Sequence, residues 1–197
     1  MAVNLTKGQK VDLTKGNSGL KSIVIGLGWD EAKPVKSGLF GKKKTQNIDC
    51  DASVFVLTNG KLAATKDVVY YGNLKHSSGG IVHQGDNLTG AGTGDCEQIM
   101  VELDKVPATC DRLIFVVNIY QAFQRNQHFG MVENAFIRIF NSRDRQELCR
   151  YNLSGAYDGT TAMIFGEVYR HGGEWKFNAI GEATRDEDLT NLAKRFM

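Results

Sequence analysis

The sequence predicts an all-β fold, a two-sheet antiparallel β-sandwich with short loops and a short C-terminal helix. Two observations lead to this prediction. Many short segments rich in β-branched and aromatic residues follow one another, with turn residues between them, and hardly any helical periodicity separates them. Strands at such spacing are typical of sandwiches. The chain has 197 residues, a length that suits one domain, so we expect a single domain over residues 1–197.

The expected strands run through most of the chain, and two turns are well marked. Asn59 and Gly60 both tolerate positive φ, so they predict a hairpin with a new strand from Lys61 onward. The stretch His171–Glu174 predicts a second hairpin. The other expected strands, in chain order, are Val3–Leu13 with a turn at Lys7 and Gly8, Ser22–Leu27, Asp51–Leu57, Val68–Tyr71, Gln98–Leu103, Arg112–Tyr120, Ala135–Phe140, Glu147–Leu153, Ala162–Arg170 and Trp175–Ile180.

The C-terminal segment is the exception to the strand pattern. Apolar residues recur at helical spacing over Asp186–Phe196, which predicts a helix there. Thr184 or Asp186 is the expected N-cap, and Lys194 and Arg195 would stand in the last turn, where positive charge is favoured.

Residues 85–97, GDNLTGAGTGDCE, carry the strongest functional signal. The stretch is rich in acids, amide, hydroxyl and glycine, and it contains no lysine or arginine. Ca²⁺ takes about six to eight oxygen ligands, and glycine lets the backbone turn its carbonyls inward. The stretch therefore predicts a Ca²⁺ loop. Its expected ligand residues are Asp86, Asn87, Gly90, Gly92, Thr93, Gly94, Asp95 and Glu97.

Other loop chemistries fit less well. A phosphate-binding loop needs a lysine where Ala91 stands, and a dinucleotide loop needs a helix where Gln98–Asp104 has the period of a strand. An EF-hand needs oxygen, oxygen and glycine at the positions of Leu88, Gly90 and Ala91. The remaining alternative is a solvated hairpin loop made of ordinary turn residues, although such loops are usually shorter.

A second acidic segment is Asn47–Leu57, NIDCDASVFVL. Alternate residues of a strand share a face, so Asp49 and Asp51 lie on one face at its polar start. Two like charges so close repel unless a cation or solvent intervenes. We interpret the pair as further carboxylates for the metal, the alternative being a strand end that water covers.

Together these segments resemble one known family. The motifs that carry the resemblance are GLGWD at Gly26–Asp30, DCDAS at Asp49–Ser53, the 85–97 stretch, FVVNIY at Phe115–Tyr120 and VENAFIRIF at Val132–Phe140. Their order and content resemble the TerD-domain family, the tellurium-resistance and stress-response proteins of bacteria, from the N-terminal VNLTKGQKVDLTK to about Ala183. The resemblance implies a cytoplasmic, Ca²⁺-binding β-sandwich. By position, the residues it assigns to the metal region are Asp49, Asp51, Asp86, Asp95, Glu97 and Asn118.

The loop departs from the family pattern at two positions. The family often carries acids where Thr93 and Cys96 stand here. Neutral ligands hold a divalent ion less tightly than carboxylates do. The resemblance implies two adjacent Ca²⁺ ions, so we expect one tight Ca²⁺ site in this chain and a second that is weaker or absent.

The resemblance implies a non-catalytic, Ca²⁺-dependent binding or scaffold module of the tellurite-resistance and chemical-stress response. The expected partners are other TerD-like or tellurite-resistance proteins, with a membrane-bound protein as a further candidate that would bring the chain to the inner face of the membrane. A net charge of +2 does not favour nucleic acid. The sequence has no run of about eighteen apolar residues, so no transmembrane segment is expected.

Two alternative functions compete with the binding module. A metal-dependent hydrolase would also gather carboxylates, but it needs a general base, and His83 is the nearest candidate. An isolated histidine beside a loop is more often a hydrogen-bonding residue, so we do not expect an enzyme. A cyclic-nucleotide or other small-ligand protein is the second alternative, although an acidic loop would repel phosphate.

The remaining features favour structural readings. Five lysines lie in Lys33–Thr45, which we interpret as a solvated loop in preference to an arm for an acidic partner or anionic lipid. The four cysteines form no CxxC pair, which agrees with a reducing cytoplasm. Cys50 lies between Asp49 and Asp51, so strand alternation predicts that it points away from them into the core.

Overall fold

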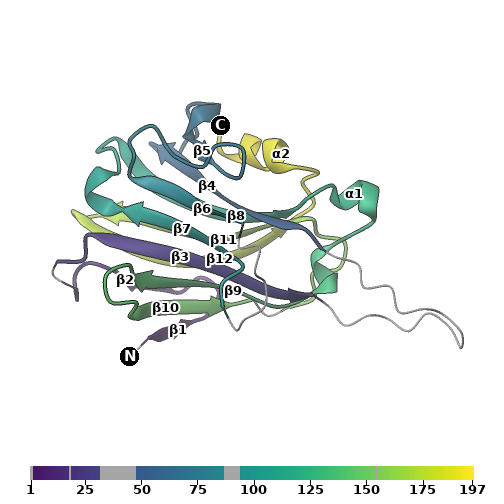
Figure 1. Cartoon of the computed structure of the whole chain (residues 1–197), viewed down its shortest axis with the longest axis horizontal. Coiled ribbons are helices and arrows are strands. Elements are labelled where there is room, and N and C mark those ends of the chain that lie inside the picture. Colours follow the sequence, from purple (N-terminus) through teal and green to yellow (C-terminus); the bar gives the residue numbers. More distant parts are fainter. Residues whose placement is uncertain (1, 18, 32–47, 87–93, 154) are drawn as a thin grey trace, which may run out of the picture.

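The computed structural model describes residues 2–17, 19–31, 48–86, 94–153 and 155–197. It confirms the predicted sandwich of two sheets (Figure 1). The first sheet has the strand order β1 (Val3–Leu5), β10 (Glu147–Asn152), β9 (Val132–Asn141), β3 (Ser22–Glu31), β7 (Glu97–Glu102) and β6 (Ile81–Asp86). The second has the order β2 (Lys10–Asp12), β12 (Glu174–Thr184), β11 (Ala162–His171), β8 (Cys110–Ile119), β4 (Cys50–Thr58) and β5 (Val68–Val69).

Helical structure in the described residues is short and lies between or after the strands. The α-helices are α1 (Ala122–Arg125) and α2 (Leu189–Ala193), and the 3₁₀ turns are η1 (Thr65–Asp67), η2 (Leu103–Lys105), η3 (Phe129–Met131) and η4 (Lys194–Phe196). Each described strand pair is antiparallel except β1 with β10, which is parallel. No helix in the described ranges is long and apolar enough to cross a membrane.

The main core lies between the two sheets. Inward residues of β3 such as Ile23, Ile25 and Leu27 are fully buried, while their outward neighbours face the other side of the sheet. The second sheet is also buried on part of its outer face, where α2 packs beside β4 and β8 (Figure 1). Burial on both faces explains why β4 and β8 are almost continuously apolar instead of alternating.

The turns appear where the sequence places them, but one expected strand is absent. Asn59 and Gly60 both have positive φ, and Thr58 and Lys61 exchange backbone hydrogen bonds across the turn. The prediction of a strand from Lys61 onward is wrong, because the next amide, that of Leu62, donates instead to the carbonyl of Phe196 at the end of the chain. The glycines of the second turn likewise have positive φ, and His171 pairs with Glu174.

Strand β6 was not expected from the sequence. Ile81 and His83 face inward and Val82 is less buried, so the alternation exists but is short. A histidine at an inward position and Gly85 after it hide the apolar pattern. Strand β6 matters because it ends at Asp86 and β7 begins at Glu97, so the two strands flank the predicted Ca²⁺ loop in the sequence.

The C-terminal helix is present but shorter than predicted. It begins at Leu189, and its N-cap is Asp188, whose side chain accepts a hydrogen bond from the amide of Asn191 at 2.7 Å. Thr184 is instead the last residue of β12, and Asp186 holds Arg195 at 2.6 Å. The two expected caps are therefore occupied elsewhere, and the helix starts at the next residue that can cap it.

Candidate metal site and its surroundings

The two sheets meet at the end of the sandwich where β4 and β7 begin and β6 and β8 end. The carboxylate of Glu97 accepts a hydrogen bond from the backbone amide of Ala52. His83 contacts the same residue, with its Nε2 3.2 Å from the Ala52 carbonyl oxygen. β5 pairs with β4 only at Val54 and Phe55, so the backbone of Ala52 lies beyond that pairing. The side chains of Glu97 and His83 provide hydrogen-bond partners for the Ala52 amide and carbonyl instead. The end of the 85–97 stretch is thereby fixed beside Asp51.

The nearest polar pair at this end is Asp51 and Asn118. They are register partners on β4 and β8, and both belong to the outer face of the second sheet, because their neighbours Ala52 and Val117 face the core. Asn118 is 7% exposed, and its Oδ1 has no hydrogen-bond partner within the described chain. A buried amide oxygen without a donor is uncommon and calls for a donor or a cation.

Asp49 stands beside this pair but in solvent. Its carboxylate is 3.6 Å from Nη1 of Arg125, and its side chain is 55% exposed. Its backbone carbonyl accepts from the amide of Tyr120 at 2.7 Å, which ties the start of β4 to the end of β8. Asp49 directly precedes β4, so its carboxylate could approach a cation bound at Asp51.

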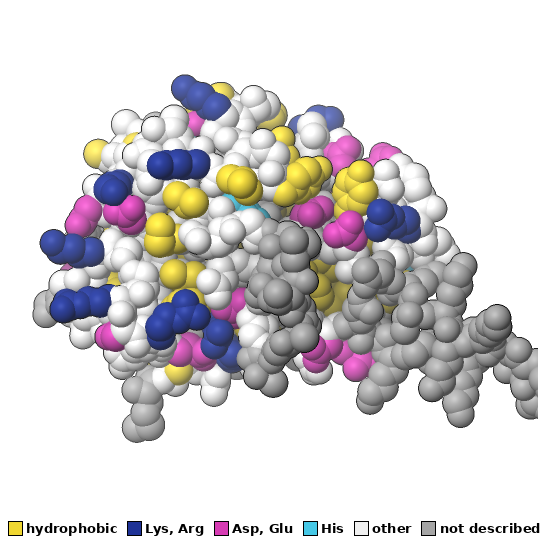
Figure 2. Space-filling view, in the orientation of Figure 1, with side chains coloured by type: hydrophobic (Ala, Val, Ile, Leu, Met, Phe, Trp, Pro, Cys, Tyr) yellow, Lys and Arg dark blue, Asp and Glu magenta, His cyan; other side chains and the backbone are white. Residues whose placement is uncertain are grey.

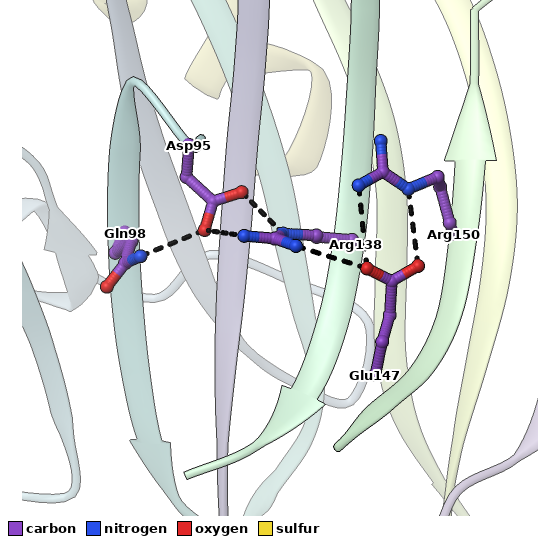
Figure 3. Close-up of polar contacts among 5 residues, drawn as sticks. All are labelled: Asp95, Gln98, Arg138, Glu147 and Arg150. Carbon is purple, nitrogen blue, oxygen red and sulfur yellow. Dashed lines mark hydrogen bonds and ion pairs between the residues drawn. The ribbon is translucent and has the colours of Figure 1, made fainter. Parts of the chain in front are cut away.

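Asp95 is held in a different place, on the outer face of the first sheet (Figure 3). Its side chain is fully buried, and Arg138 donates to its two oxygens at 2.6 and 3.1 Å. Gln98 donates to it at 2.9 Å. The hydrogen bond from Arg138 to Asp95 raises the pKa of the guanidinium above its ordinary value, against the effect of burial. Glu147 continues the network from Arg138 to Arg150.

Arg138 and Gln98 were not among the site residues predicted from the sequence, although one signal pointed to them. Gly26, in the middle of β3, is the register partner of Gln98 on one side and of Arg138 on the other. A Cβ at Gly26 would lie 2.2 Å from Cγ of Asp95. A glycine inside a strand often marks a close approach, and here the approaching group is the Asp95 carboxylate.

The predicted ligand residues thus fall into separate groups. Asp51 and Asn118 lie together with Asp49 beside them, Glu97 points to the Ala52 backbone, and Asp95 is bound by Arg138. Asp86 pairs through its backbone with Glu97, and Gly94 is exposed. Four other predicted ligand residues lie outside the described residues, namely Asn87, Gly90, Gly92 and Thr93. The basic Lys33–Thr45 segment also lies outside them. In the described ranges no group of three or more His, Cys, Asp or Glu residues is arranged to hold a metal.

His83 has a structural role, as the sequence analysis expected. Its Nδ1 accepts from the amide of Gly85 at 3.1 Å, so the ring proton resides on Nε2, which faces the Ala52 carbonyl. Nε2 is also 3.6 Å from Glu97. Both ring nitrogens are engaged, which leaves this histidine poorly placed to act as a general base.

The two cysteines near the acids are structural as well. Cys50 is buried in the core cluster, as predicted, and burial first, with the charge of Asp51 second, raises the pKa of its thiol well above the ordinary value. Cys96 is half-buried, and its Sγ donates to the carbonyl of Trp29 at 3.4 Å. Burial raises its pKa too. Neither thiol has the electropositive setting that reactive cysteines share.

The fold is a two-sheet β-sandwich in which the acidic side chains of the site lie in separate groups. The TerD domain family matches residues 1–196, and the chain belongs to that family, the tellurium-resistance and stress-response proteins of bacteria. It is 52% identical over 202 residues to the stress response protein SCP2 of Bacillus subtilis (strain 168), covering 100% of both chains. It is 44% identical to the tellurium resistance protein TerD of Serratia marcescens, covering 92% of this chain and 91% of the relative.

Solved structures agree on the fold. A homologue of telluride resistance protein (TerD) from Streptomyces coelicolor A3(2) matches with a TM-score of 0.64 at 23% identity, covering 91% of this chain and 99% of that chain. At this identity the likeness establishes the shared sandwich and nothing finer.

Proposed function

We propose that this protein is a non-catalytic Ca²⁺-binding module of the bacterial tellurite-resistance and stress response. The ion would bind at the end of the sandwich, on the outer face of the second sheet, where Asp51 and Asn118 are register partners. It acts in the cytoplasm with other TerD-domain or tellurite-resistance proteins, a membrane-bound protein being one candidate. The names of its relatives support the physiological setting.

The observation that carries the metal proposal is the Oδ1 of Asn118, the register partner of Asp51, which has no hydrogen-bond partner among the residues that the structure describes. Carboxylate and amide oxygens are the ligands Ca²⁺ prefers, and the residues present therefore fit the ion. Asp49 and the oxygen-rich 85–97 stretch are candidates for the rest of its coordination. Asp95 is not needed for this arrangement, since Arg138 and Gln98 already occupy its carboxylate.

Two further observations support details of the proposal. Cys96 turns its thiol to the Trp29 carbonyl, so it supplies no charge where the family often has an acid, in line with one tight and one weaker Ca²⁺ site. His83 has both ring nitrogens engaged with backbone groups, which favours a binding role over hydrolysis. A bound Ca²⁺ would supply positive charge and fix the strand ends around it, with no bond made or broken.

We expect Ca²⁺ to raise the melting temperature of the protein. A ligand that binds only the folded state, at a hundredfold excess over its dissociation constant, adds about 2.7 kcal/mol, which corresponds to several degrees for a domain of this size. Thermal unfolding followed by circular dichroism in Ca²⁺ and in chelator measures the shift. Mg²⁺ should substitute poorly because it requires a tight octahedron. Superimposable curves in Ca²⁺ and chelator would refute the proposal.

A further inference from the structure

A groove of about 460 Å³ lies on the outer face of the second sheet, between β5, α1 and α2. We call it the α2 groove. Its lining includes the apolar residues Leu62, Val68 and Leu189 together with polar residues. Hydrophobic and acidic side chains lie close together on the upper right of the molecule in Figure 2, the side where Figure 1 places α1. A cavity of this size suits a small organic ligand better than a bare metal ion.

The charged side chains that line the α2 groove are acidic. Asp51, Glu187 and Asp188 line it, and among the described residues that line it none is Lys, Arg or His. Asp188 uses one oxygen to cap α2, whereas Glu187 is exposed at the rim. Carboxylates that line a groove favour a cation and repel phosphate.

Asn118 supplies a second, independent observation. It lines the groove, it is 7% exposed, and its Oδ1 lacks a hydrogen-bond donor in the described chain. A ligand that brings an N–H donor would satisfy this oxygen, and a positively charged donor would do so most strongly.

Tyrosine rings form the third component of the groove. Tyr71 is 57% exposed, and Tyr70 packs edge-on against it with ring centroids 5.1 Å apart. Tyr71 lines the groove together with Asp51. A tyrosine ring can attract a cation through its face, and Tyr120 does so, because the Arg125 guanidinium lies 5.1 Å from its ring centroid.

We propose that the α2 groove binds an alkylammonium group, with the ammonium against Asn118 and Asp51, the tyrosine rings beside it, and the alkyl chain against the apolar residues of the lining. The ligand is an aliphatic amine, either a free diamine or the side chain of a lysine. This site goes beyond the proposed Ca²⁺ function and does not require it. The two share Asp51 and Asn118, so Ca²⁺ and the amine compete.

Calorimetric titration of chelator-treated protein with putrescine tests the proposal. Butanediol, which has the same carbon chain without charge, should bind at least about tenfold more weakly. A lysine blocked at both its amino and carboxyl groups is the second amine probe. Tighter binding of putrescine would identify a free diamine as the ligand, and tighter binding of blocked lysine a peptide side chain. Equal binding of butanediol and the amines, or no binding of either amine at millimolar concentration, overturns the proposal.

Two variants locate the site away from the proposed metal ligands. Tyr71→Leu keeps apolar bulk without the aromatic face, and Glu187→Gln removes a rim charge, so each should weaken amine binding about threefold to tenfold. Glu133→Gln, an exposed glutamate at the start of β9, is the matched control and should leave it unchanged. Unchanged affinity in both groove variants would contradict the location. Ca²⁺ titration of the same proteins separates the two proposals, because it should be unaffected by Tyr71→Leu.

Discussion

Replacement of Arg138 by methionine should lower the free energy of unfolding by about 3–5 kcal/mol. The Asp95 side chain is fully buried, and Arg138 is its charged partner in the network of Figure 3. Methionine keeps most of the apolar stem and removes the charge, so it leaves a buried carboxylate uncompensated. Urea unfolding followed by circular dichroism measures the loss.

Two companion variants sharpen this test. Arg150→Met removes an arginine from the half-buried pair with Glu147, where about 1 kcal/mol or less is expected. Adding Asp95→Asn to Arg138→Met removes the stranded charge and should restore much of the stability. A loss for Arg138→Met no larger than that for Arg150→Met would show that Asp95 does not depend on its partner.

Replacement of Glu97 by alanine should cost about 2–4 kcal/mol of unfolding free energy. Its carboxylate accepts from the amide of Ala52, a residue with no exposed surface, so alanine leaves that amide without an acceptor and opens a cavity beside His83. The two sheets lose a link at the end where we place the metal. Urea unfolding again gives the loss, and hydrogen exchange at the Ala52 amide should accelerate.

Glu97→Gln is the matched control for that prediction. Its side-chain carbonyl keeps an acceptor of nearly the same shape, so the expected cost is about 1 kcal/mol. Equal losses for the alanine and glutamine variants, with unchanged exchange at Ala52, would mean that the hydrogen bond does not hold the sheets together.

The fold was largely predictable because both its strands and its turns leave local signals. Asn59 with Gly60, and the glycines before Glu174, turn the chain through positive φ as expected. The prediction of a strand after Lys61 was wrong because the backbone amide of Leu62, which a hairpin would have used, donates to the carbonyl of Phe196, a residue distant in sequence. Strand β6 was not predicted because one of its inward positions is occupied by His83 and not by an apolar residue.

The site was predictable in composition and less so in arrangement. Strand alternation placed Asp49 and Asp51 on one side, but it could not show that Asn118 would be the register partner of Asp51. The roles of Asp95 and Glu97 depend on Arg138 and on the Ala52 backbone, and each of these contacts joins segments more than forty residues apart in sequence. No local pattern carries such information, although Gly26 marked where one contact would form.

The central claim is that Ca²⁺ binds beside Asp51 and Asn118, and calorimetric titration of Ca²⁺ into chelator-stripped protein tests it most directly. Wild-type protein should show one tight binding step. Asp51→Asn, which preserves shape and removes the charge, should weaken that step at least about tenfold, while Glu133→Gln should leave it unchanged. No heat of binding to wild-type protein, or equal affinity in Asp51→Asn, would contradict the claim.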